Sequence, residues 1–143
     1  MYVRRSFAVA AAFAAVAVGA ATPASAAPEM SGHYTETETD ASGRSTTNDW
    51  YFTPCGDGCA SVALKGAPAF GRAQLVGGQW KFDVTGNTAM CQDGSQVPNA
   101  LSAHYTWDPS TLAGTVQSTA DVTECGDPAG YQVSDNIQLR QAH

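Results

Sequence analysis

Four cysteines are the residues of this chain whose spacing points most directly to chemistry: Cys55, Cys59, Cys91 and Cys125. Thiols pair into disulfides in oxidising compartments, and in reducing ones they bind zinc or act in redox catalysis. Four cysteines allow three disulfide pairings. The sequence Cys-Gly-Asp-Gly-Cys at 55–59 favours a tight turn, because glycine accepts the backbone angles that bring its ends together. We therefore predict the pairs Cys55–Cys59 and Cys91–Cys125.

The other two readings of these cysteines fit the spacing poorly. A structural zinc site normally uses two closely spaced pairs, whereas Cys91 and Cys125 lie far apart in sequence. A thioredoxin-like site needs Cys-x-x-Cys at the start of a helix, and no helix is indicated here. We expect structural disulfides, with no metal and no cofactor.

Asp135 is the carboxylate with the most unusual predicted position. Apolar and polar residues alternate through 131–139, and Asp135 falls on the apolar face. An unpaired carboxylate in a core costs several kcal/mol, so it needs a partner, water or a raised pKa. We predict that Asp135 faces a ligand in the interior, together with the large side chains of Trp80 and Trp107. The alternative that these tryptophans are only core remains open.

Other acids and the histidines give little support for catalysis. Glu36 and Glu38 lie two apart on one strand face and could suggest the carboxylate pair of a glycosidase. Their Thr/Glu-rich surroundings favour a solvated face instead. His104 falls on a polar strand face, and no nucleophile elbow, zinc-binding helix, phosphate loop or calcium loop is present in the sequence. We expect a protein that is not an enzyme, with a hydrolase as the least favoured alternative.

The elements that must position these residues are all predicted to be strands. Alternating patterns separated by Gly, Pro, Asp and Ser turns occupy 33–39, 44–53, 59–65, 69–76, 79–85, 101–107, 111–123 and 131–139. Residues 86–99 are predicted to be an irregular loop held by Cys91. Eight consecutive antiparallel strands favour an all-β meander that rolls into a small closed or partly open barrel, because an open sheet would leave two edges unpaired. A two-sheet sandwich is the alternative.

The first residues predict export. Arg4 and Arg5 precede an apolar run from 7 to 21, and a small-x-small site follows, which is typical of a signal peptide cleaved between Ala26 and Ala27. The paired arginines leave open whether export follows the general or the twin-arginine route. The apolar run is shorter than the roughly 20 residues that a transmembrane helix needs. We predict a leader at 1–26 and one secreted domain at 27–143, without stable membrane insertion.

Composition limits the partners of the predicted mature domain. The chain has seven Lys and Arg against thirteen Asp and Glu, and the leader contains two of the arginines and no acid. The mature net charge is therefore about −8. No basic stripe could neutralise phosphates, which argues against nucleic acid and anionic lipid as partners.

Several segments together resemble a family of small secreted proteins from mycobacteria and related actinobacteria. The likeness rests on Gly-His-Tyr-Thr at 32–35, the Pro-Cys-Gly-Asp-Gly-Cys-Ala-Ser-Val turn at 54–62, Gly-Gln-Trp at 78–80, Cys-Gln-Asp-Gly at 91–94, Leu-Ala-Gly-Thr at 112–115 and Cys-Gly at 125–126. The resemblance implies export and two disulfides, and it brings no catalytic residues. Similar segments are also expected in larger envelope proteins.

Together these features favour an extracytoplasmic binding or interaction module, secreted to the envelope or the medium. Its partner would be a small apolar ligand in the barrel or an extracellular protein. A secreted inhibitor that presents residues 86–99 as a pinned loop is the alternative hypothesis.

Overall fold

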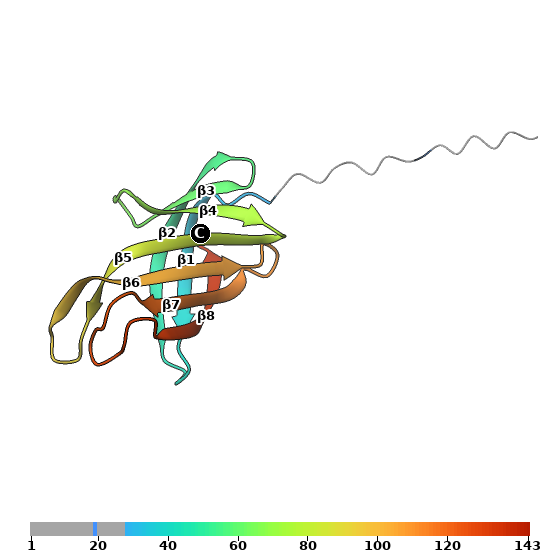
Figure 1. Ribbon diagram of the computed structural model, residues 1–143. Coiled ribbons are helices and arrows are strands. Elements are labelled where there is room, and N and C mark those ends of the chain that lie inside the picture. The colour runs from blue at the N-terminus through green and yellow to red at the C-terminus, as the bar shows by residue number, and fades with distance from the viewer. Residues whose placement is uncertain (1–18, 20–27) are drawn as a thin grey trace, which may run out of the picture.

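The computed structural model describes residue 19 and residues 28–143, in which eight strands close into a barrel (Figure 1). The predicted signal peptide and its cleavage site at Ala26 and Ala27 lie outside the described residues. The strands are β1 (Gly32–Thr39), β2 (Ser45–Gly56), β3 (Cys59–Ala63), β4 (Ala69–Val76), β5 (Gln79–Met90), β6 (Gln96–Trp107), β7 (Ala113–Ala120) and β8 (Gln132–Gln141). Among the described residues, no helix is long and apolar enough to cross a membrane.

The sheet is an antiparallel meander in which each strand pairs with the next, and β8 returns to pair with β1. The predicted barrel is confirmed, and the two-sheet sandwich is wrong. Closure leaves no unpaired sheet edge, and the alternation of each strand sends one set of side chains inward and the other outward.

The barrel has two different ends. The turns at 57–58, 77–78 and 108–112 lie at one end, together with the start of β1 and the end of β8. Met30 packs into the core there, and the Ala142 backbone N–H donates to the His33 carbonyl over 2.9 Å. We call this the closed end. The turns at 40–44, 64–68 and 91–95 and the segment 121–131 lie at the opposite end, which we call the mouth.

Aromatic side chains fill the closed half of the barrel. Trp80 and Trp107 are 1% and 0% exposed and stack with ring centroids 6.4 Å apart. Phe52 meets Trp107 edge to face at 5.9 Å. Each ring buries a large apolar area, so a few aromatics replace many aliphatic side chains. The buried cluster comprises Met30, Tyr34, Trp50, Phe52, Ala60, Val62, Ala73, Trp80, Phe82, Ala103, Trp107, Val116, Ile137 and Leu139.

Two glycines inside strands make room for this packing. A Cβ atom at Gly71 would lie 2.6 Å from the Phe82 ring. A Cβ atom at Gly114 would overlap the backbone carbonyl oxygen of Thr106 on the neighbouring strand β6. Glycine in a strand marks such close approaches, so both positions favour glycine over any residue with a side chain.

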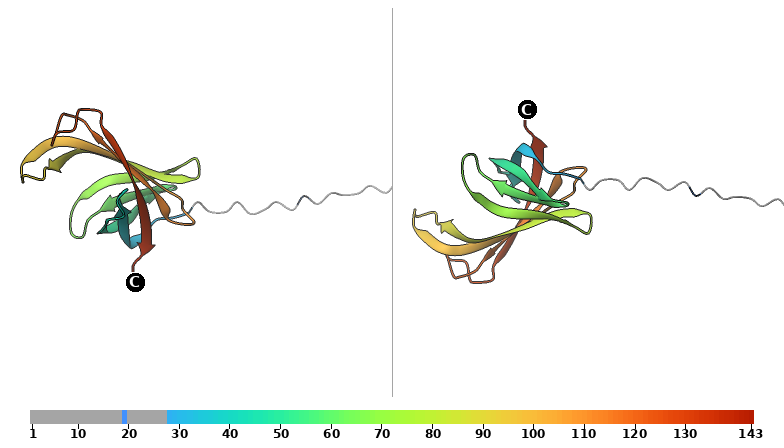
Figure 2. Two further views of the ribbon diagram at one scale, coloured as in Figure 1. Left: turned by 90° about the horizontal axis from the view of Figure 1, so that it is seen from below. Right: turned by 90° about the horizontal axis from the view of Figure 1, so that it is seen from above.

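Residues 86–99 are not the irregular loop that the sequence predicted. β5 continues to Met90 and β6 begins at Gln96, so only the turn at 91–95 is outside the strands. The pairing shifts register around Asn87, and Gly86 and Asn99 have left-handed φ angles of 74° and 51°. These bulges break the alternation that a strand normally shows. Figure 2 shows the resulting long β5–β6 hairpin extending past the other strands.

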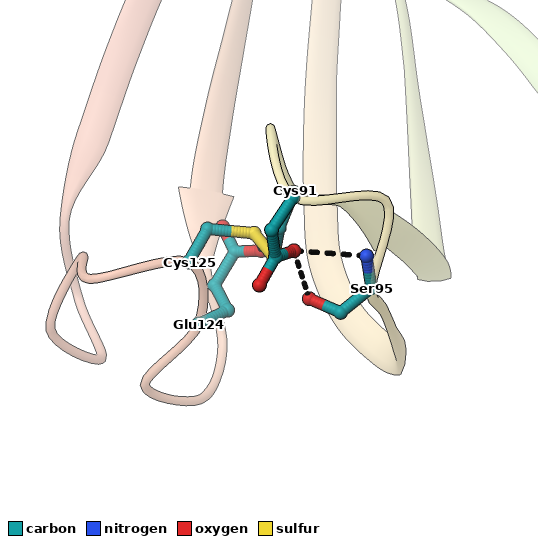
Figure 3. The surroundings of a disulfide bond; sticks show 5 residues. Cys91, Ser95, Glu124 and Cys125 are labelled. Carbon is teal, nitrogen blue, oxygen red and sulfur yellow. Dashed lines mark hydrogen bonds between the residues drawn. A yellow bond between two sulfur atoms is a disulfide. The ribbon is translucent and has the colours of Figure 1, made fainter.

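Both predicted disulfides are confirmed. Cys55–Cys59 joins residues four apart across the β2–β3 turn at the closed end. Cys91–Cys125 joins the tip of the β5–β6 hairpin to the segment between β7 and β8 at the mouth (Figure 3). Two disulfides are consistent with an oxidising environment.

Candidate ligand site at the barrel mouth

Strand β1 carries two carboxylates into the barrel. Tyr34, Glu36 and Glu38 alternate along β1, and Glu36 is 0% exposed. The expected solvated face is therefore wrong for this pair. The threonines of the strand take the outer face, where Thr37 exchanges a hydrogen bond of 3.2 Å with Thr47 on β2. The inward position of Tyr34 was the available signal, because side chains two apart on a strand share a face.

Glu36 is buried with only half of its carboxylate partnered. The Asn48 amide on β2 donates to Glu36 Oε2 over 3.0 Å, while Oε1 has no hydrogen-bond partner. Burial raises the pKa of Glu36, and the hydrogen bond from Asn48 lowers it. A buried acceptor without a donor is costly, so Oε1 is a polar group that the described residues leave unsatisfied.

Glu38 and Asp135 form the next layer toward the mouth. Asp135 lies on the inner face of β8 opposite Val116, as the alternation of 131–139 predicted, and its Oδ1 is buried without a partner. Burial, hydrogen bonding with Asp135 and the charges of Glu36 and Asp135 together raise the pKa of Glu38 to about 7. Near neutral pH, Glu38 therefore still holds its proton in a large part of the molecules.

An aromatic wall borders these carboxylates. A cavity of about 320 Å³ is lined by Asn48, Trp50, Leu64, Phe70, Val84, Asn87 and Tyr105. Trp50 meets Phe70 and Tyr105 edge to face, with ring centroids 6.0 and 5.2 Å away. Burial, together with the charges of Glu38 and Glu36, raises the pKa of Tyr105 to about 12. The charges of Glu36 and Glu38 therefore act on a side chain of the aromatic cavity.

A second cavity opens directly onto the carboxylates. It measures about 420 Å³ and is lined by Glu38, Asp40, Arg44, Thr46 and Asp135. Arg44 is the one basic side chain that the described residues contribute to this lining, and its Nε lies 3.2 Å from Asp40 Oδ2. Because Asp40 already pairs with Arg44, the two inward carboxylates keep an excess of negative charge at the mouth.

A third cavity, of about 730 Å³, lies beside the Cys91–Cys125 disulfide. Figure 3 shows the surroundings of this disulfide. The cavity is a cleft between the β5–β6 turn and the segment 121–131. Its polar groups are bound within their own turns: the Ser95 backbone N–H and hydroxyl both donate to Asp93 Oδ1, over 2.9 and 2.5 Å. Glu124 at this cleft is 8% exposed, and its backbone pairs with Asp127. The cleft has fewer unsatisfied groups than the mouth.

The sequence-predicted site residues separate into two groups. Asp135 borders the mouth, whereas Trp80 and Trp107 belong to the packed core at the closed end. The indole nitrogens of both tryptophans are buried without a partner. Outside the barrel, His104 Nδ1 lies 2.6 Å from Asp83 Oδ1, which agrees with its predicted polar face.

Residues at the mouth were missed because most of them have no signature of their own. Asn48, Phe70 and Tyr105 become neighbours only when β2, β4 and β6 curve into one barrel. In the part of the chain that the structure describes, no group of three His, Cys, Asp or Glu side chains could hold a metal ion.

No protein-family model matches this chain, and comparisons with curated proteins and with solved structures found no match. The functional argument therefore rests on the geometry of the mouth.

Proposed function

We propose that this protein is a non-enzymatic extracytoplasmic binding protein that holds a small ligand at the mouth of its β-barrel. The observation that carries the proposal is the combination of inward carboxylates and an aromatic wall at one open end. Small-ligand sites are concave, mostly apolar, and contain a few polar groups that fix orientation. The cavities of about 320 and 420 Å³ fall in the range of such sites.

The polar groups of the mouth support binding because they are costly without a ligand. Glu36 Oε1 and Asp135 Oδ1 are both buried and unpartnered. A fold retains such groups at a stability cost, and a ligand that offers donors or positive charge would offset it. The closed half of the barrel contains no comparable carboxylate among the described core residues.

The location outside the cytoplasm is supported by two independent features. The sequence begins with the pattern of a signal peptide, and all four cysteines are paired. The resemblance to small secreted actinobacterial proteins points to the same compartment.

The inhibitor hypothesis stays a prediction. It requires residues 86–99 to be presented rigidly, and in the structure they form the end of the β5–β6 hairpin rather than an irregular loop. Cys91 ties the turn at 91–95 to Cys125.

Native mass spectrometry of the protein, purified from the culture medium of its own host, tests the proposed function. We expect an added mass that mild solvent treatment removes. Val84 lines the aromatic cavity, so Val84→Trp should fill it and abolish the added mass. Val76→Trp is the matched control, because Val76 is exposed at the closed end. A protein that carries no added mass and gains none from an extract of the medium would contradict the proposal.

A further inference from the structure

We infer that the ligand of the mouth is an organic cation, a tertiary or quaternary ammonium compound with an apolar body. This inference rests on the proposed function and names the chemical class of its ligand. It follows from the charge of the carboxylate cavity, the aromatic lining of the second mouth cavity and the unsatisfied carboxylate oxygens of the mouth.

The charge of the mouth favours a cation. Glu36, Glu38 and Asp135 all face the interior, from β1 and β8. The one basic side chain that lines either mouth cavity, in the residues the structure describes, is Arg44, which is paired with Asp40. Three carboxylates in a partly dry site attract positive charge more strongly than they would in water.

The buried oxygen of Glu36 is a second, separate observation. Glu36 is 0% exposed, its Oε2 accepts a hydrogen bond from Asn48, which lines the aromatic cavity, and its Oε1 has no partner. A neutral apolar ligand would leave this oxygen unsatisfied. A cation in the cavity would stabilise it through space without displacing Asn48.

Three aromatic rings, Trp50, Phe70 and Tyr105, line the aromatic cavity. Trp50 makes angles of 65° with Phe70 and 78° with Tyr105, so the rings pack edge to face rather than in a flat stack. Ring faces carry negative potential, and several of them around one point attract an ammonium group, most strongly when it is poorly hydrated. Alkylated ammonium ions meet this condition better than metal ions, which need converging oxygen ligands.

The test uses choline and its uncharged isostere 3,3-dimethylbutan-1-ol, with benzyltrimethylammonium as a larger cation. Each is titrated into the ligand-stripped protein at pH 8 and followed by tryptophan fluorescence, with calorimetry as the second readout. We expect benzyltrimethylammonium to bind and choline to bind at least ten times more tightly than its isostere. Binding by the cations should weaken at least tenfold in the double variant Glu38→Gln, Asp135→Asn. Asp57→Asn, at the closed end, should leave it unchanged.

The outcomes separate this inference from the proposed function. Equal binding of choline and its isostere would overturn the cation inference and leave a small-ligand site in place. The same conclusion would follow if the ligand released from the native protein were neutral or anionic. No binding of any probe, with no ligand released from the native protein, would overturn both proposals. The double variant removes charge repulsion from the barrel, so we expect it to fold. A loss of binding in this variant would then reflect the lost charges rather than unfolding.

Discussion

Glu38 links the stability of the barrel to pH. Its folded pKa of about 7 lies above the ordinary value of 4.5, so the folded state holds this proton more tightly than the unfolded state. The resulting stability is fully present below about pH 4.5 and is lost as pH rises through 7. Turn carboxyls such as Asp40, whose pKa is lowered to about 2 chiefly by its hydrogen bond with Ser42, titrate below this window.

We therefore expect Glu38→Gln to be more stable than the wild type at pH 8. The gain should be about 1–2 kcal/mol, because Glu38 is partly exposed and solvent screens part of the effect. Urea unfolding at pH 5 and pH 8, followed by tryptophan fluorescence, measures both values. The wild type should lose more stability than the variant between the two pH values. Equal losses would contradict the assignment of this pH dependence to Glu38.

The same proton should oppose cation binding. A cation that lowers the pKa of Glu38 by about one unit should bind about tenfold more tightly at pH 8 than at pH 5. Titration of benzyltrimethylammonium at both pH values measures this ratio, and Glu38→Gln should remove most of it. The other groups that face Glu38 are Glu36, Asp135, Tyr105 and the Asp40–Arg44 pair. Tyr105, with a pKa of about 12, does not titrate in this range.

Only part of the mouth could be predicted from single residues. Asp135 was found because apolar neighbours on both sides fix the inner face of its strand. Glu36 and Glu38 were missed because β1 has one large apolar residue, Tyr34, on that face, and the polar residues around them resemble a solvated strand. Alternation assigns residues to a face, but composition alone does not say which face is inside.

At the scale of elements, β7 depends on the absence of a side chain at Gly114. Gly114→Ala would drive a Cβ atom into the Thr106 carbonyl, and backbone on a paired strand cannot move aside without breaking its hydrogen bonds. We expect a loss of about 2–4 kcal/mol, comparable to severe overpacking of a core. Thermal and urea unfolding would measure it. Gln117→Ala, on the exposed face of the same strand, is the control and should change stability by less than about 0.5 kcal/mol.

The eight strands and most of their order were predictable because turn residues separate clear alternating runs. The exception is 86–99, where Gly86, Pro98 and Asn99 resemble the residues of a loop. In the structure the left-handed angles of Gly86 and Asn99 serve bulges inside a hairpin. A bulge and a loop use the same residue types, so local sequence does not distinguish them.

For the molecule as a whole, the two disulfides should contribute unequally to the free energy of unfolding. Cys91–Cys125 closes a span of 34 residues and Cys55–Cys59 a span of four. On the chain-entropy model they are worth about 4 and about 2 kcal/mol, because the longer loop restricts the unfolded chain more. Each pair is replaced by serines, and the free energy of unfolding is obtained from the midpoint and the slope of the urea transition. The difference between the two losses tests this prediction. A larger loss from the Cys55–Cys59 pair would show that local geometry outweighs chain entropy.

The barrel was predictable at this scale from the number of strands and their short connections, because closure removes the edges of a meander. Which end is open was not predictable. It depends on how the bulky rings of β5 and β6 fill one half of the barrel, while the carboxylates of β1 and β8 occupy the other.

The first and the last strand of the described domain place both of its chain termini at the closed end of the barrel, since β1 starts there and β8 finishes there. A biotin or an affinity tag at the carboxyl terminus would therefore attach the protein to a sensor chip with its mouth facing the flowing solution. A fusion partner on either terminus would likewise leave the mouth uncovered. The geometry makes the domain suitable as an oriented capture layer.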